Sequence, residues 1–218
     1  MTGIQTDRRV HQVRDLSSSA YVVRFDRGGM AFQPGQYVLV GLGGKGEMRE
    51  FTVYSSSQDD YLEILVKEIE GGLVSRALRR CRPGDRLRVE GPFGRFTVDD
   101  PSPRDAPLVL VGSGTGISPY HCFRRSYGEL RCRVLHGVRT SAELYDRHVF
   151  DASAFQACVS REDTGDYRGR VTDYLRAHPV DARSHCYLCG NCAMIHDAFD
   201  ILRGQGVPAA RLHTEVYF

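Results

Sequence analysis

Three glycines at alternate positions follow a short apolar run in the middle of the chain. The run, residues 107–111, has the character of a buried strand, and the residues after it, with Gly112, Gly114 and Gly116, lead into a predicted helix at Pro119. Glycine lets the backbone pass close to a bulky group, and the helix behind it would direct free N–H groups and its positive dipole end toward that group. The natural ligand of such a strand–loop–helix unit is an anion, here the pyrophosphate of a dinucleotide. The spacing departs from the GxGxxG fingerprint, so the loop alone indicates a phosphate site without identifying the ligand.

The composition indicates a protein with a substantial hydrophobic core and no strong charge bias. The 218 residues allow two domains of about 100 residues each, 41% of the residues are hydrophobic, and the formal net charge is +2. Such a balanced charge argues against a nucleic-acid partner. No stretch reaches the roughly 18 apolar residues that span a bilayer, and residues 1–14 are polar, without a signal-peptide core. We therefore expect a cytoplasmic protein without a membrane partner, in which the seven cysteines are thiols.

The first hundred residues are predicted to form an antiparallel β-barrel or sandwich. Short runs rich in β-branched and aromatic residues alternate with turns that contain glycine or proline. The predicted strands are residues 21–25, 37–40, 51–54, 61–66 and 86–89. One helix is predicted among them, over residues 73–80.

A linker with three prolines, residues 99–107, separates this part from a region with a different rhythm. Beyond it, apolar strand runs alternate with helical patterns, as in βαβ units around a parallel sheet. Strands are predicted at residues 108–111, 132–138, 157–160 and 185–188, and helices from residue 119 and at 142–150, 171–177 and 194–204. We therefore expect two domains: an N-terminal antiparallel β-barrel over residues 1–100 and a C-terminal α/β nucleotide-binding domain with a parallel sheet over residues 107–218.

Two further motifs lie in the predicted barrel. Residues 49–55, Arg-Glu-Phe-Thr-Val-Tyr-Ser, combine an arginine suited to phosphate, an aromatic ring suited to a planar ligand and a hydroxyl group. The same residues are compatible with an ordinary half-buried strand that carries an exposed charge. Gly71 and Gly72 precede the predicted helix, with Ser75 near its start, which makes either an ordinary loop or a second anion site. Two phosphate sites, one in each domain, would indicate two nucleotides.

Taken together, these motifs resemble those of the ferredoxin–NADP(+) reductase family of flavoproteins. The resemblance follows the same order along nearly the whole chain. The matching segments resemble, in order, the RxYS-type flavin motif, the flavin-pyrophosphate motif, the turn closing the flavin domain, the NADP-pyrophosphate loop, the Cys-Gly-Asn segment near the nicotinamide and the aromatic tail of stand-alone members. They are residues 49–52, 71–75, 91–94, 112–119, 189–191 and 215–218.

The resemblance implies FAD as the cofactor of the first domain. Phe51 would pack beside the isoalloxazine, and the Thr52 hydroxyl would hydrogen-bond flavin N5. Arg49 and Ser75 would bind the FAD pyrophosphate, and the main chain near Tyr54 would hold the polar edge of the ring. The FAD-binding residues implied are Arg49, Glu50, Phe51, Thr52, Val53, Tyr54, Val66, Gly71, Gly72, Leu73, Val74, Ser75, Tyr217 and Phe218.

For the second domain, the resemblance implies NADP(H). Ser160 and Arg161 resemble the pair that binds the adenosine 2′-phosphate, and Arg170 resembles a second basic contact. A phosphomonoester favours arginine, whereas an NAD-specific site more often places a carboxylate at the ribose. The NADP-binding residues implied are Gly114, Thr115, Gly116, Arg139, Thr140, Ser160, Arg161, Arg170, Cys189, Gly190 and Asn191.

The resemblance also implies the reaction. A hydride would pass between NADP(H) and flavin N5, and single electrons would pass between FAD and a small acidic carrier protein, a ferredoxin or flavodoxin. The residues implied at the reacting rings are Thr52, Cys189, Glu215 and Tyr217. Tyr217 would stack on the isoalloxazine as a gate that leaves when nicotinamide arrives, and Phe218 could cover the adenine.

Arginine-rich clusters suit an acidic partner, and we expect a monomer that docks a separate carrier. The clusters are Arg76, Arg79, Arg80 and Arg82, and Arg124, Arg125, Arg131 and Arg133. Three alternatives stay open: an NAD(P)H-dependent reductase component of an oxygenase, a flavin reductase that releases reduced flavin, and an electron-transfer or nucleotide-sensing subunit of a larger complex. The aromatic tail and the flavin-pyrophosphate motif argue against the flavin reductase, since both would retain the flavin.

Three cysteines have a spacing that a metal site could use. Cys186, Cys189 and Cys192 are three residues apart, but no nearby cysteine completes a plant-type iron–sulfur pattern, and Cys186 is expected to point away on its strand. We therefore expect no metal, with a redox-sensitive Cys189–Cys192 pair as a weaker alternative. The eight histidines are scattered without a ligand set, and His136 is interpreted as a strand-end residue.

Overall fold

The structure is a computed structural model that describes residues 6–43, 46–98, 108–128 and 130–217. The chain divides into two compact units: Met1–Asp99 with His121–Ser126, and Asp100–Tyr120 with Tyr127–Phe218. The whole of the predicted linker, residues 99–107, and Phe218 at the tail lie outside the described residues. None of the helices in the described ranges has the length and apolar character needed to cross a bilayer.

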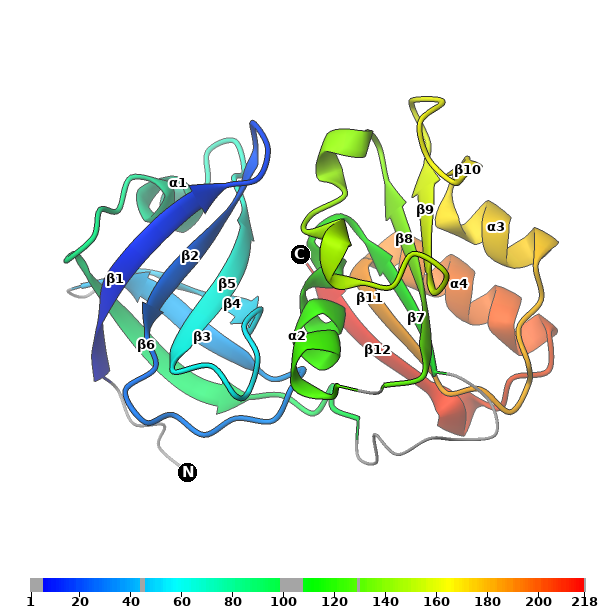
Figure 1. Ribbon diagram of the computed structural model, residues 1–218, viewed down its shortest axis with the longest axis horizontal. Helices are drawn as coiled ribbons and strands as arrows, with labels where there is room; N and C mark the ends of the chain where they lie inside the picture. The colour runs from blue at the N-terminus through cyan, green and yellow to red at the C-terminus, as the bar shows by residue number, and fades with distance from the viewer. Residues whose placement is uncertain (1–5, 44–45, 99–107, 129, 218) are drawn as a thin grey trace. The chain divides into compact units, whose positions relative to one another are not determined.

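The first unit is built on a six-stranded antiparallel sheet (Figure 1). Its strands are β1 (Thr6–Asp15), β2 (Ala20–Asp26), β3 (Tyr37–Leu42), β4 (Met48–Thr52), β5 (Tyr61–Lys67) and β6 (Arg86–Phe93), in the order β4-β3-β6-β1-β2-β5. A bridge between Val53 and Ile64 joins the two outer strands, so the sheet closes into the predicted barrel. One helix, α1 (Leu73–Arg79), packs Val74 and Leu78 into the barrel core.

Strand β1 is not among the predicted strands, because its residues alternate in burial but not in hydrophobicity. Arg8 and Val10 are buried whereas Asp7, Arg9 and His11 are exposed, so every second residue faces inward. Only one of these five residues is apolar. The period-2 pattern that identifies a strand is therefore present in burial but nearly absent in hydrophobicity.

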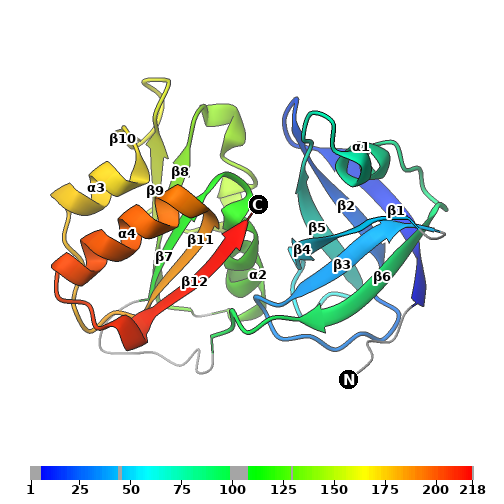
Figure 2. The same cartoon turned by 180° about the vertical axis from the view of Figure 1, so that it is seen from behind.

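The second unit is a six-stranded parallel sheet covered by helices. Its strands are β7 (Leu108–Ser113), β8 (Cys132–Val138), β9 (Phe155–Val159), β10 (Tyr167–Arg168), β11 (Cys186–Asn191) and β12 (Leu212–Tyr217), in the order β10-β9-β8-β7-β11-β12. Helices α3 (Val171–Ala177) and α4 (Cys192–Gly204) lie side by side on one face, and α2 (Ser118–Ser126) begins on the other (Figures 1 and 2). This confirms the predicted combination of an antiparallel barrel with a parallel α/β unit.

The predicted helix over residues 142–150 is wrong. The structure has two short 3-10 turns there, Ser141–Glu143 and Arg147–Val149. Between them Asp146 adopts a left-handed conformation with φ of 45°, which an α-helix cannot include. The apolar spacing that suggested the helix instead places Tyr145 and Phe150 in buried positions of an irregular segment.

Candidate functional site

The glycine loop packs backbone to backbone against a second predicted segment. After β7, Gly114–Ile117 form one 3-10 turn before α2 begins. A Cβ added at Gly116 would lie 2.2 Å from the Cys189 carbonyl oxygen, and one added at Gly190 would lie 2.4 Å from Ser113 Oγ. The structure therefore brings the predicted Gly114–Gly116 and Cys189–Gly190 together at a distance that only glycine permits.

Strand β12 places the predicted reacting residues beside this junction. In the parallel register, Cys189 on β11 pairs with Glu215 and Asn191 pairs with Tyr217. The Cys189 side chain is completely buried, and burial raises the pKa of its thiol well above the ordinary value, with the nearby Glu215 carboxylate acting in the same direction. Cys189 is thus a neutral thiol, unsuited to nucleophilic chemistry and suited to packing at the end of the sheet.

The basic residues predicted to bind a 2′-phosphate lie along the carboxyl edge of β8, β9 and β10. The Arg161 backbone N–H donates to the Arg139 carbonyl at 2.9 Å, and the Ser160 N–H donates to Val138 at 3.0 Å. Arg170 follows β10, whose next residue, Gly169, donates to Val159 at 2.9 Å. Arg139, Arg161 and Arg170 are exposed, and within the described ranges none of their side chains forms an ion pair.

One carboxylate next to these arginines is already committed to its own loop. Glu162 accepts hydrogen bonds from the Ser141 N–H at 2.8 Å and the Ser141 hydroxyl at 2.9 Å, and these bonds lower the pKa of Glu162. The Thr164 hydroxyl donates to the same oxygen at 3.2 Å. The Glu162 carboxylate therefore links the loop after β8 to the loop after β9. The neighbouring Arg161 is exposed.

In the first unit, the predicted flavin residues form two groups: the residues of β4, described first, and residues whose side chains lie in the protein interior. Arg49 and Glu50 are exposed, and Arg49 pairs with Glu47 at 2.8 Å. Phe51 is half-buried against the barrel core, and Thr52 is buried at the end of β4. The side chains of the second group lie in the interior, so only their backbones can face a ligand; they are Val53, Tyr54, Val66 and Val74.

Tyr54 is anchored on both its ring and its backbone. Its ring stacks on that of His121 with centroids 3.8 Å apart. Its N–H donates to the Glu63 carbonyl at 2.7 Å, and its carbonyl oxygen lies 3.1 Å from His121 Nδ1. A role for the Tyr54 backbone at a ligand would therefore use the second lone pair of a carbonyl that already has one partner.

The predicted flavin-pyrophosphate motif forms a tight turn with apolar side chains on its outside. Gly71 has φ of 76°, and the Gly72 N–H donates to the Ile69 carbonyl at 2.9 Å. The Ser75 hydroxyl accepts from the Ile69 N–H at 3.3 Å. Leu73 and Ile69 are 73% and 56% exposed, so the turn presents apolar surface that a covering ligand would bury.

Comparison with known proteins identifies both units. Residues 8–98 match the model of the oxidoreductase FAD-binding domain, and residues 110–200 match that of the oxidoreductase NAD-binding domain. Ferredoxin–NADP reductase B of Sorangium cellulosum is 29% identical over 242 residues, an alignment that covers 97% of both chains. This chain belongs to the ferredoxin–NADP reductase family. As a member of that family it is an oxidoreductase with an FAD-binding and an NAD(P)-binding domain.

Other relatives of this family member are parts of oxygenase systems. The electron transfer component of toluate 1,2-dioxygenase from Pseudomonas putida is 27% identical, and this chain covers 66% of its length. The reductase component of propane 2-monooxygenase from Mycolicibacterium smegmatis is 31% identical, and this chain covers 56% of its length. The crystal structure of the Amycolatopsis cytochrome P450 reductase GcoB matches with a TM-score of 0.84 and 28% identity, over 99% of this chain and 71% of that one. The chain thus spans between about half and two thirds of several curated relatives.

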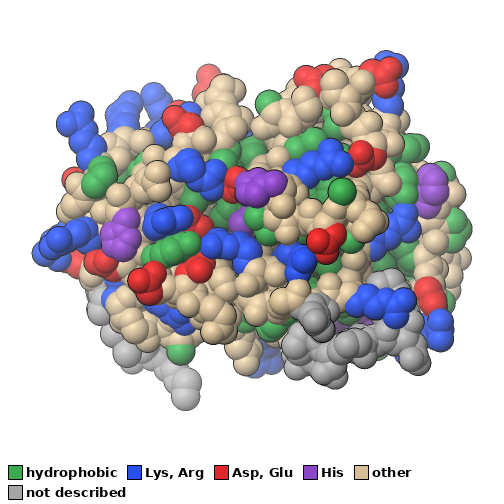
Figure 3. Space-filling model, in the orientation of Figure 1, with side chains coloured by type: hydrophobic (Ala, Val, Ile, Leu, Met, Phe, Trp, Pro, Cys, Tyr) green, Lys and Arg blue, Asp and Glu red, His purple; other side chains and the backbone are tan. Residues whose placement is uncertain are grey.

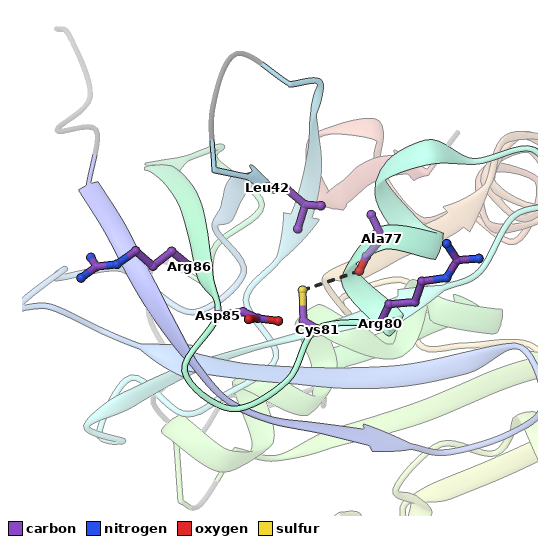
Figure 4. A pocket seen from close by; sticks show the side chains of 6 residues that line it. All are labelled: Leu42, Ala77, Arg80, Cys81, Asp85 and Arg86. Atoms are coloured by element: carbon purple, nitrogen blue, oxygen red, sulfur yellow. Dashed lines mark hydrogen bonds between the residues drawn. The ribbon is translucent and has the colours of Figure 1, made fainter.

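One surface pocket is lined by none of the predicted site residues. It has a volume of about 470 Å³ and opens between the end of α1 and the strands β3 and β6 (Figure 4). Within it Cys81 Sγ donates to the Ala77 carbonyl at 3.6 Å, and burial raises the pKa of the Cys81 thiol. The lining residues are Leu42, Ala77, Arg80, Cys81, Asp85 and Arg86.

The three regularly spaced cysteines, Cys186, Cys189 and Cys192, have different surroundings. Cys186 is buried in the core cluster beneath α3 and α4, whereas Cys192 is the exposed first residue of α4. Cys192 Sγ lies 3.8 Å from His196 Nε2 one turn along the helix. Among the described residues, no three or more His, Cys, Asp or Glu side chains are grouped so that they could hold a metal ion.

Sequence reasoning missed the residue that contacts the glycine loop from below. His136 was interpreted as a strand-end residue, but β8 continues to Val138 and His136 is completely buried inside it. Its Nε2 lies 2.8 Å from the Gly114 carbonyl oxygen. The signal was present as a histidine within an apolar strand run, where a buried polar group needs a partner.

Proposed function

We propose that this chain transfers a hydride between NADP(H) and FAD and exchanges single electrons with a small acidic carrier protein, a ferredoxin or flavodoxin. The activity is that of a ferredoxin–NADP(+) reductase. The observation that carries the proposal is the junction of Gly116 with Cys189 and Gly190, beside Glu215 and Tyr217 at the carboxyl end of the parallel sheet. Ligands of open α/β sheets bind at that end.

The first unit has the features that FAD binding requires. The turn at Gly71 is open, with no atom within 4 Å of a Cβ added there, and the exposed Leu73 and Ile69 offer apolar surface to a ligand. We propose that Arg49 and Ser75, with the backbone from Gly71 to Val74, hold the pyrophosphate. Thr52 and Phe51 hold the ring, with the backbones of Glu50, Val53, Tyr54 and Val66 along its edge.

The second unit has the features that a pyridine dinucleotide requires. We propose that Gly114, Thr115 and Gly116 hold its pyrophosphate through backbone N–H groups. The carboxyl-edge residues Arg139, Thr140, Ser160, Arg161 and Arg170 would hold the adenosine end, and three unpaired arginines favour NADP(H) over NAD(H) because the 2′-phosphate adds charge. Cys189, Gly190 and Asn191 would lie at the nicotinamide end.

The side chains near the reacting rings would orient the nicotinamide and control its access to the flavin. When bound, FAD supplies the exchange between a two-electron donor and a one-electron carrier. The neutral Cys189 thiol and Glu215 would pack and polarise the nicotinamide pocket, and Tyr217 would shield the flavin ring until nicotinamide displaces it. Phe218, outside the described residues, would cover the adenine. We propose the domain limits 1–100 and 107–218, a monomeric state and a cytoplasmic location.

A reductase component of an oxygenase is the second candidate function. The toluate dioxygenase and propane monooxygenase components match this chain over 95% and 81% of its length. This chain covers only 66% and 56% of these two relatives, so the match does not include every part of them. The two functions share the flavin and nucleotide sites and differ in the protein that receives the electrons.

A titration of the purified protein tests the proposed function. We expect flavin absorbance that is bleached by NADPH, with a much higher KM for NADH. Arg161→Ala should raise the KM for NADPH about tenfold or more, equivalent to roughly 1.4 kcal/mol, and leave the KM for NADH nearly unchanged. Arg168→Ala is the matched control, since Arg168 is an exposed neighbour paired with Asp163 at 3.8 Å. Equal effects of the Arg161 variant on both nucleotides would contradict the preference, and absence of flavin would contradict the function.

A further inference from the structure

His136 occupies the centre of the parallel sheet directly beneath the glycine loop. In register it pairs with Gly112 on β7 and with Ala157 on β9, and its side chain is completely buried. Its ring meets that of Phe155 edge-on, with centroids 6.1 Å apart and planes at 73°. Packing therefore holds the imidazole in one orientation. It lies on β8, the strand next to β7, which leads into the glycine loop.

The contact with Gly114 assigns the proton on the ring. A carbonyl oxygen can only accept, so the 2.8 Å contact requires that Nε2 of His136 carries the hydrogen. Nδ1 is buried without a partner among the described residues, as expected for the bare nitrogen of a neutral ring. Burial lowers the pKa of His136 to about 4, which keeps this tautomer neutral at physiological pH.

Holding this carbonyl has a consequence for the next N–H group. Gly114 has φ of 54°, a left-handed conformation that glycine adopts without steric cost. In a planar trans peptide the C=O and the following N–H point in opposite directions. Because the Gly114 carbonyl points inward to His136, the Thr115 N–H points outward, and the carbonyl oxygen is kept away from any anion bound at the loop.

We propose that His136 is a positioning residue for the pyridine dinucleotide, acting through its hydrogen bond to Gly114. The bond orients the Gly114–Thr115 peptide so that the Thr115 N–H faces the pyrophosphate. This inference rests on the proposed function, because it needs a dinucleotide at the glycine loop. His136 itself touches neither the nucleotide nor the flavin in this proposal.

Two substitutions separate the hydrogen bond from the packing. His136→Phe keeps an aromatic ring without a donor, and His136→Gln keeps an N–H donor without the ring. We expect the Phe variant to bind NADP(+) at least tenfold more weakly by calorimetry, while the Gln variant stays within about threefold of the wild type. Binding of adenosine 2′-monophosphate, which lacks the pyrophosphate, should change less than twofold in both variants.

Hydrogen exchange gives a readout without any ligand. Peptides that cover residues 112–120 should exchange faster in the Phe variant than in the wild type or the Gln variant. If the Gln variant binds weakly and the Phe variant normally, packing is what matters and the proposal is overturned. Unchanged NADP(+) affinity in both variants overturns it as well. If the wild type binds no pyridine dinucleotide, the proposed function itself fails, and that result is distinct from a wild type that binds and variants that match it.

Discussion

Tyr120, His136 and Cys189 are among the titratable side chains of the second unit that are completely buried. Burial penalises the charged form of each, so the pKa of His136 falls to about 4 and those of Tyr120 and Cys189 rise well above their ordinary values. All three groups are neutral at physiological pH. The positive field offered to an anion then comes from exposed arginines such as Arg161 and from the backbone N–H groups of the glycine loop.

The buried His136 should make the fold sensitive to mild acid. Its pKa is lowered from 6.5 in the unfolded chain to about 4 in the folded one, so the unfolded state takes up the proton first as pH falls. Stability that is present above pH 6.5 is lost progressively toward pH 4. Between about pH 7.5 and pH 5 we expect the wild type to lose roughly 2 kcal/mol more unfolding free energy than His136→Gln.

Urea unfolding at the two pH values measures this difference. His148→Gln is the control, since it makes the same substitution at an exposed histidine of the same unit. A wild type and a His136→Gln variant that lose the same unfolding free energy would show that His136 is protonated as easily in the folded state as in the unfolded one.

At the scale of elements, the start of α4 links a helix to the glycine loop. Asn191 is the N-cap, and its side-chain oxygen accepts from the N–H groups of Ala193 at 3.1 Å and Met194 at 3.4 Å. The Asn191 N–H in turn donates to Ser113 Oγ at 3.1 Å. One residue thus ends β11, caps α4 and ties both to the end of β7.

Removing this cap should weaken the second unit. Asn191→Ala leaves the first-turn N–H groups without their side-chain acceptor, and we expect the unfolding free energy to fall by about 1 kcal/mol. Asn191→Asp keeps an acceptor at the same position and should retain most of the stability. Thermal unfolding of the three proteins checks the prediction, and an alanine variant as stable as the wild type would exclude a capping role.

At the scale of the whole molecule, the two arginine clusters differ in how much charge they leave available. In the cluster around residue 125, Arg125 is bound to Glu63 at 3.0 Å and to Asp59 at 2.8 Å. In the cluster near α1, Arg79 pairs with Asp15 at 2.8 Å and Arg76 with Glu68 at 4.0 Å. Arg80 and Arg82, with the neighbouring Arg86, are exposed and form no ion pairs among the described residues. On the face shown in Figure 3, Lys and Arg side chains gather over the end of the first unit that carries α1. This cluster is the better candidate for docking an acidic carrier.

Reversing this charge tests the carrier proposal. Arg80→Glu with Arg86→Glu should raise the KM for an acidic ferredoxin or flavodoxin about tenfold at low salt, and the difference should shrink at high salt because surface charges are screened. Reduction of ferricyanide by NADPH should not change. Arg176→Glu is the control, since Arg176 lies on α3 and pairs with Asp173 at 3.0 Å. A carrier KM that is equal in all three proteins would place the docking surface elsewhere.

The two-part architecture and the motif at Gly112 to Gly116 could be predicted from the sequence. Both depend on local patterns: apolar runs at strand or helix spacing, and glycines and prolines that mark turns. The sequence also indicated the exposed arginines after β9 and the Cys189-Gly190-Asn191 segment. The resemblance to the ferredoxin–NADP(+) reductase family singled these residues out, because an exposed arginine or a cysteine does not by itself reveal a binding role.

Features that depend on residues far apart in the chain emerged only in the folded protein. The fold made a strand of residues 6–15, whose inward positions include Arg8, because pairing with β2 and β6 outweighs the weak hydrophobic pattern. It broke the expected helix at Asp146. It also brought His136 to the Gly114 carbonyl, 22 residues away in sequence, and Glu215 beside Cys189. Such contacts arise from sheet order and register, which a single strand's composition does not specify.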